Sequence, residues 1–112
     1  MTEQADALSS ASPVARALYE ELLRALAPVG AFEAEVKKTS IHLVRSSAFA
    51  GVHPRKQHLL VTIKATAPIP SGRIVKTEQV SANRWHLDVK IAVAGDIDAE
   101  LLGWLREAYA IC

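Results

Sequence analysis

The sequence contains only one cysteine and few aromatic residues, 5% of the total, and its net charge is only +1. Because Cys112 is the single cysteine, no disulfide can form within the chain, and a reducing compartment is expected. The near-neutral charge argues against a nucleic-acid-binding protein that works through bulk charge. No apolar run approaches the roughly twenty residues of a membrane span, and residues 1–12 lack the basic start and apolar run of a secretory signal. We therefore expect a cytoplasmic protein without a membrane partner.

What is present is an ordinary globular composition. Hydrophobic residues make up 50% of the 112 residues and charged residues 22%, which is typical of one compact domain. Residues 1–11 are small and polar and are expected to form a flexible N-terminal tail. The single domain is then expected to span residues 12–112.

Two amphipathic helices are predicted, one near each end of the chain. Ser12 followed by Pro13 predicts a helix start, because serine can cap free N–H groups and proline at the first helical position loses no needed donor. Apolar residues recur every fourth position from there to Leu26, which indicates an amphipathic helix. Asp96 or Asp98 is expected to cap the second helix.

Between the helices the sequence alternates with the period of strands. The strongest alternation runs from Trp85 to Val93, with its odd-numbered residues expected on the buried face. Residues 32–38 fit either a helix or a strand. The predicted strands cover residues 39–45, 49–53, 58–65, 74–80 and 85–93, the fourth of them as an edge strand in a hairpin with the fifth.

These elements predict a two-layer α+β fold. Every strand connection is short, so the sheet of about five strands is expected to be antiparallel. The N-terminal and C-terminal helices need one apolar surface, and both are expected to pack on one face of the sheet.

If both helices cover one face, the other face carries basic and histidine side chains. Arginine and lysine supply positive charge, and histidine supplies donors that depend on protonation, so this surface suits an anionic ligand. The alternative is a solvated face, or one covered by a second copy of the chain. The candidate ligand-binding residues are His42, His53, Arg55, Lys56, His58, Arg73, Arg84 and His86.

No catalytic or metal-binding motif supports an enzyme. The four histidines have no carboxylate or cysteine at a recognisable ligand spacing, so no metal or other cofactor is expected. Glu35-Val36-Lys37 fits a short element of metal-dependent nucleases, but its acidic partner on a neighbouring strand is missing. The sequence contains no GxSxG element and no glycine-rich phosphate loop. Catalytic residues are therefore not assigned.

Three separated blocks of the sequence resemble a known family. They are FAGVHPRKQHLLVTIKA, GRIVKTEQVSANRWHLDVKIA and DIDAELLGWLREAYA, and they are similar to the bacterial domain-of-unknown-function family 5655. The resemblance implies an α+β domain of the bacterial cytoplasm and brings no established activity. The residues that match the family pattern are Lys37, Lys38, Phe49, His53, Pro54, His58, Arg73, Arg84, Trp85, His86, Trp104 and Tyr109.

The leading interpretation is a non-enzymatic binding or interaction domain for a small anionic ligand or another protein, with nucleic acid less favoured. One alternative is a phosphate-ester hydrolase or nuclease-like enzyme, which predicts a concave pocket where a histidine meets a carboxylate such as Asp88. A second alternative is a structural homodimer without a ligand, which predicts burial of Leu60 between two copies. The ligand and the oligomeric state do not follow from the sequence.

Overall fold

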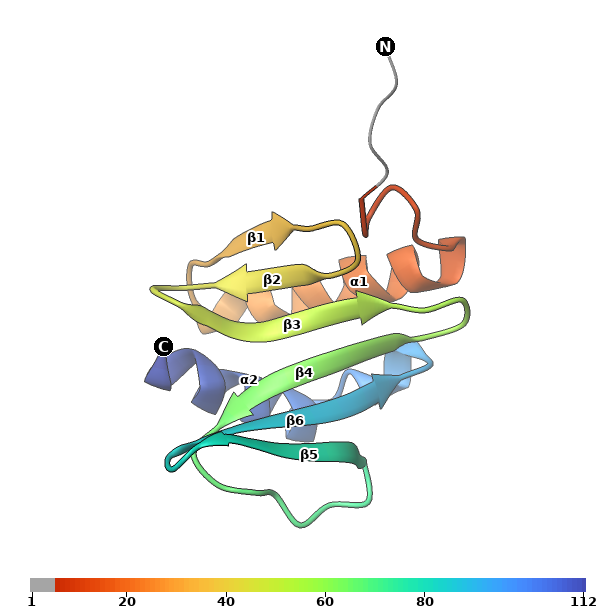
Figure 1. Ribbon diagram of the computed structural model, residues 1–112. Helices are drawn as coiled ribbons and strands as arrows, with labels where there is room; N and C mark the ends of the chain where they lie inside the picture. Colours follow the sequence, from red (N-terminus) through yellow and green to blue (C-terminus); the bar gives the residue numbers. More distant parts are fainter. Residues whose placement is uncertain (1–5) are drawn as a thin grey trace.

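The computed structural model, which describes residues 6–112, consists of one sheet with two helices behind it (Figure 1). The sheet is entirely antiparallel, with strand order β1-β2-β3-β4-β6-β5. The strands are β1 (Glu33–Val36), β2 (Ile41–Val44), β3 (Ala48–Pro54), β4 (Leu59–Ala65), β5 (Ile74–Ser81) and β6 (Arg84–Ile91), and the helices are α1 (Pro13–Leu26), α2 (Ala99–Ile111) and the 3₁₀ turns η1 (Ala27–Val29) and η2 (Ala94–Asp96).

The predicted α+β fold with both helices on one face is confirmed. The strand number is six, because the ambiguous residues 32–38 contain β1, which pairs with β2 along its whole length. The predicted edge strand and hairpin are also confirmed, since β5 lies at the edge and pairs only with β6. Neither α1 nor α2 has the length and apolar character needed to cross a membrane.

Helix α1 begins where the sequence predicts. The hydroxyl of Ser12 accepts a hydrogen bond from the backbone N–H of Ala15 at 3.1 Å and donates one to the carbonyl of Lys56 at 2.8 Å. The cap therefore also ties the start of α1 to the turn between β3 and β4. In α2 the cap is Asp98, which accepts from the backbone N–H of Leu101 at 3.0 Å.

The apolar faces of the sheet and the helices form one core. Alternate residues of the central strands belong to this core, including Val61 and Ile63 of β4 and Val89 and Ile91 of β6. Both helices contact β3 and β4. A bulge between β2 and β3 adds one residue, Phe49, to β3. This extra side chain also points into the core, so two consecutive residues of β3 are buried.

One expectation about β6 is wrong. The alternating pattern places Val93 on the buried face, but β6 ends at Ile91 and Val93 is 59% exposed. The reason is local: a carboxylate oxygen of Asp96 accepts hydrogen bonds from the backbone N–H groups of Ala92 and Val93 at 2.9 and 3.2 Å. These donors are satisfied by the turn at η2, and the chain leaves the sheet there.

The expected N-terminal tail covers residues 1–11, of which 1–5 lie outside the described residues. Residues 6–11 form a turn in which Ala7 is buried and its N–H donates to the carbonyl of Lys37 at 2.9 Å. The division into a tail and a domain from residue 12 onwards stays a prediction.

Candidate functional site: a groove on the open face of the sheet

The face of the sheet away from the helices carries a row of side chains that crosses four neighbouring strands and reaches β5. Its members are consecutive pairing partners, and Gly51 occupies the middle position on β3. Because glycine has no side chain, the row is hollowed at that point. In order across the sheet the row reads His42, Gly51, Thr62, Asp88 and Lys76.

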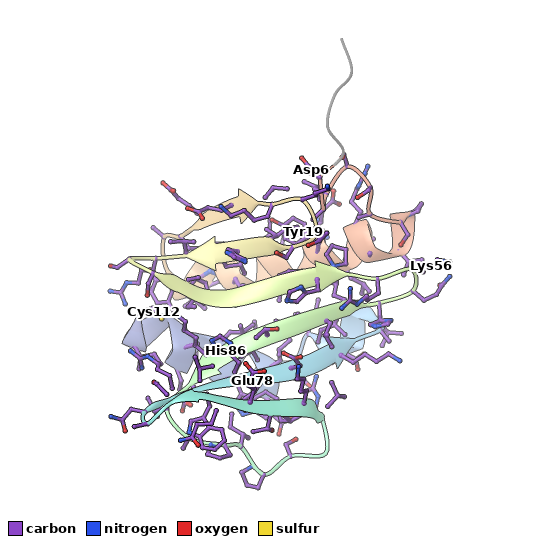
Figure 2. All side chains as sticks on the ribbon, in the orientation of Figure 1. Asp6, Tyr19, Lys56, Glu78, His86 and Cys112 are labelled. Atoms are coloured by element: carbon purple, nitrogen blue, oxygen red, sulfur yellow. The ribbon has the colours of Figure 1, made fainter. Side chains whose placement is uncertain are left out.

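The hollow widens into a groove of about 540 Å³ over β2 to β6. Its floor is formed by the backbone and small side chains of β3 together with Leu60 and Thr62 of β4. Figure 2 shows two members of its wall, His86 and Glu78, on the paired strands β6 and β5. The polar residues that line the groove are His42, His53, Arg55, Thr62, Lys64, Lys76, Glu78, His86 and Asp88.

The groove lowers the pKa of His53. Partial burial lowers its pKa below the ordinary value of 6.5, and the nearby positive charge of Arg55 lowers that pKa further. Asp88 acts in the opposite direction, and His42 adds a small lowering effect. The protonated form of His53 is therefore disfavoured in the unliganded protein, and an anion beside the ring would favour it.

The carboxylate of Asp88 is held by a hydroxyl group. Thr62 on the neighbouring strand donates a hydrogen bond from Oγ1 to Oδ1 of Asp88 at 2.7 Å. Among residues 6–112, no histidine is hydrogen-bonded to this carboxylate. The second carboxylate oxygen thus keeps its capacity to accept a hydrogen bond from a ligand.

Two of the basic side chains in the groove are not neutralised by an acid. Lys76 forms an ion pair with Glu78 of its own strand, at 3.8 Å. Arg55 and Lys64 make no ion pair with any acidic side chain within residues 6–112. Their charge is thus available to a ligand.

The structure brings four of the eight predicted site residues together. His42, His53, Arg55 and His86 all line the groove. Strand alternation predicted this face for His42 and His86, and His53 and Arg55 were expected at one end of it, near the polar turn. In particular, His53 and His86 share one accessible region, as predicted.

Two further candidates lie beside the groove and not in it. Lys56 is exposed in the turn between β3 and β4 (Figure 2), where it lines a second hollow of about 440 Å³ that also has Arg55 in its wall. His58 follows this turn and is half-buried. Desolvation lowers its pKa, and the positive charges of Lys90 and Arg55 lower it further.

Arg73 and Arg84 are not part of this groove. The Arg73 guanidinium binds the carboxylates of Asp98 and Glu100 at 2.8 and 3.1 Å and the carbonyl of Asp96 at 2.6 Å. It therefore links the loop before β5 to the start of α2, which packs on the opposite face. Arg84 starts β6 at the hairpin that joins it to β5. The expectation of one surface containing all eight residues is corrected accordingly.

Other members of the groove are absent from the predicted set. Alternation places Thr62, Lys64 and Asp88 on this face, and that pattern was enough to find them. Lys76 and Glu78 could not be found in the same way, because a register shift in β5 reverses the faces of its residues relative to Ile74.

No metal site emerges from the described part of the chain, in which no three histidine, cysteine or acidic side chains converge in a way that could hold an ion. The nuclease-like element is on the exposed edge strand β1 and the residue after it. Its Glu35 and Lys37 form an ion pair with each other at 3.5 Å, and Glu35 does not line the groove.

A comparison with protein families gives one match. Residues 4–111 match the family described as Domain of unknown function (DUF5655). The comparisons with curated proteins and with solved structures match nothing. Because the family match covers nearly the whole chain, the chain belongs to the DUF5655 family.

Proposed function

We propose that this member of the DUF5655 family is a non-enzymatic binding domain that holds a small anionic ligand in the groove on the open face of its sheet. Bacterial origin and a reducing, cytoplasmic location are part of the same proposal, on the compositional and family grounds given above. Most of the groove lies on the central strands β2, β3, β4 and β6, each of which pairs with a strand on both sides.

One observation carries the proposal: the groove combines three histidines with two basic side chains that make no ion pair within residues 6–112. A basic side chain on a protein surface is normally surrounded by water, and by itself it does not indicate a binding site. Here Arg55 and Lys64 line the same groove as His53, whose pKa is lowered by burial and then by the charge of Arg55. An anion bound there would gain charge-assisted hydrogen bonds.

The size and lining of the groove favour a small molecule over nucleic acid. Its volume of about 540 Å³ lies within the range of small-molecule sites, roughly 300–1,000 Å³. Among the described residues that line it, none is Phe, Tyr or Trp. Proteins that bind single-stranded nucleic acid usually stack the bases on such side chains.

A second candidate function, hydrolysis of a phosphate ester, is favoured by the shape of the site. The groove is concave, and the charge of Asp88 acts on His53 within it, as expected for an enzyme. Binding is the better-supported function, because Asp88 is hydrogen-bonded to Thr62 and not to a histidine that it could orient. Release of p-nitrophenol from p-nitrophenyl phosphate, abolished by His53→Ala, would favour the enzyme.

The binding proposal can be tested by thermal shift with inorganic phosphate, sugar phosphates, nucleotides and short single-stranded DNA as probes. A probe at a hundred times its Kd should add about 2.7 kcal/mol to stability. We expect His53→Ala and Arg55→Ala to reduce this gain. The matched controls are His58→Ala and Lys56→Ala, which remove a histidine and a positive charge outside the groove.

Two results would contradict the proposal. One is a set of shifts that the groove variants and the controls change equally, which would place binding elsewhere. The other is no shift with any probe while light scattering gives the mass of a dimer and Leu60→Glu makes it monomeric. That result would identify the open face as an interface between two copies of the chain.

A further inference from the structure

The groove is polarised across the sheet, and this bears on the kind of anion that it would take. On the side of β2 and β3 its charged and titratable residues are His42, His53 and Arg55, without an acid. On the side of β5 and β6 it contains two carboxylates, Asp88 and Glu78, together with Lys76 and His86. A groove meant for a bare anion alone would not be expected to place carboxylates in its wall.

The two carboxylates are in different situations. Glu78 has a cation beside it, Lys76, at 3.8 Å. Asp88 has Lys76 as its pairing partner across the strands but forms no ion pair with it at 4.0 Å or less within residues 6–112. What binds Asp88 is the neutral hydroxyl of Thr62 at 2.7 Å. The carboxylate of Asp88 is therefore not paired with a cation among residues 6–112, and one of its oxygens has no donor among them.

The distance between the two sides suits a small molecule with two unlike ends. Gly51 on β3 and Asp88 on β6 are separated by one intervening strand, β4. Neighbouring strands are about 4.8 Å apart, and His53 lies two residues, about 6.6 Å, along β3 from Gly51, so the Cα atoms of His53 and Asp88 are roughly 12 Å apart. The intervening floor presents Leu60 and Thr62, which carry no charge.

From these observations we propose that the groove selects anions that also carry hydrogen-bond donors. The anionic group would bind beside His53 and Arg55, and hydroxyl or ammonium groups at the other end would donate to Asp88. Sugar phosphates and phosphorylated amino alcohols have this chemistry. This inference rests on the proposed function, and it makes Asp88 the residue that determines specificity.

The test compares probes that share an anion and differ in donors. Inorganic phosphate has no second end, ribose 5-phosphate adds hydroxyls, and O-phosphoethanolamine adds an ammonium group. Isothermal titration calorimetry should show the donor-bearing probes binding at least about tenfold more tightly than phosphate, as expected for a hydrogen bond to a charged group. The tighter binder of ribose 5-phosphate and O-phosphoethanolamine shows whether Asp88 accepts a hydrogen bond from a hydroxyl or from an ammonium group.

The diagnostic variant is Asp88→Asn, which keeps the oxygen that accepts from Thr62 and removes the charge. We expect it to bind phosphate more tightly than the unaltered protein and to lose most of the preference for donor-bearing probes. The control is Glu35→Gln, an exposed carboxylate outside the groove, which should leave both affinities unchanged. Circular dichroism spectra of both variants establish that they are folded.

The outcomes separate the two proposals. Equal affinities for the three probes, or a preference that survives in folded Asp88→Asn, would overturn the role of Asp88 and leave anion binding in place. No binding of any probe, either by the unaltered protein or by Asp88→Asn, would overturn the proposed function, and this inference would fall with it.

Discussion

Replacement of Gly51 by alanine should make the protein more stable and a weaker binder. Gly51 is in the middle of β3, between His42 and Thr62 in the cross-strand row. Its backbone does not require glycine, since Gly30 is the residue with positive φ among those described. A Cβ at position 51 would be 3.6 Å from Nε2 of His53 and 3.9 Å from Cβ of Thr62. Both are ordinary van der Waals distances, so the methyl group fits without movement.

The expected gain in stability follows from the unfolded chain. Glycine inside a strand costs about 0.5–1 kcal/mol relative to alanine, because it loses more conformational freedom on folding. Gly51→Ala should therefore raise the free energy of unfolding by about 0.5–1 kcal/mol. With an m-value of about 2 kcal/mol/M, the urea midpoint should rise by about 0.3–0.5 M at an unchanged m-value.

The same methyl group would occupy the hollow of the groove. We expect the affinity for the best phosphate-bearing probe to fall although the fold is more stable. Gly72→Ala is the matched control: it is in the loop before β5, and a Cβ there would have no neighbour within 4 Å. It should give a similar gain in stability with unchanged binding.

The reasoning is refuted by a lower urea midpoint for Gly51→Ala, since that would mean that the methyl group is not accommodated on the open face. Equal loss of binding in both variants would refute the assignment of the groove as the site.

Further predictions concern the core, the cap of α1, the ion pairs of Arg73 and the pH dependence of stability. Phe49→Ala should cost about 3–5 kcal/mol in urea denaturation, because the ring is 1% exposed and meets two aromatic rings edge to face; a cost below 1 kcal/mol would contradict this packing. Ser12→Ala should cost about 1 kcal/mol through loss of the α1 cap, and Ser12→Thr, whose hydroxyl can both accept from Ala15 and donate to Lys56, should restore most of it. Arg73→Met should cost about 1 kcal/mol, and less in high salt, because its ion pairs are partly exposed. Because the pKa of His53 is lowered from 6.5 in the folded protein, the unfolded chain takes up the proton first, and stability should fall as the pH drops below 6.5. His53→Gln should reduce this slope, and a slope that stays unchanged would contradict the assignment; His58, whose pKa is also lowered, keeps part of it.

Several features of the fold could be predicted because they depend on local chemistry. The Ser12–Pro13 start of α1 and the alternation of β4 and β6 follow from capping and from the period-two geometry of strands. The open face followed from the same alternation, and with it the positions of His42 and His86, whereas His53 was predicted from its place beside the polar turn. The family match agrees with the resemblance seen in the three sequence blocks.

Residues 32–38 could not be assigned because their pattern fits either a helix or a strand, and pairing with β2 decides the matter. The position of Arg73 was missed for a similar reason. Its role depends on acidic residues 23 or more positions away in the sequence, which come close only when α2 packs behind the sheet.

The sequence by itself therefore determined both helices, five of the six strands, the faces of β2, β4 and β6 and the class of fold, since these depend on residues near one another in the chain. Only the tertiary structure decided the composition of the groove. The register shift in β5 pairs Ile74 with Val89 and then Lys76 with Asp88. It thus turns Lys76 and Glu78 toward the groove, although simple alternation from Ile74 would place them on the opposite face. Such a shift arises from how two strands meet in space, and no periodicity within one strand records it.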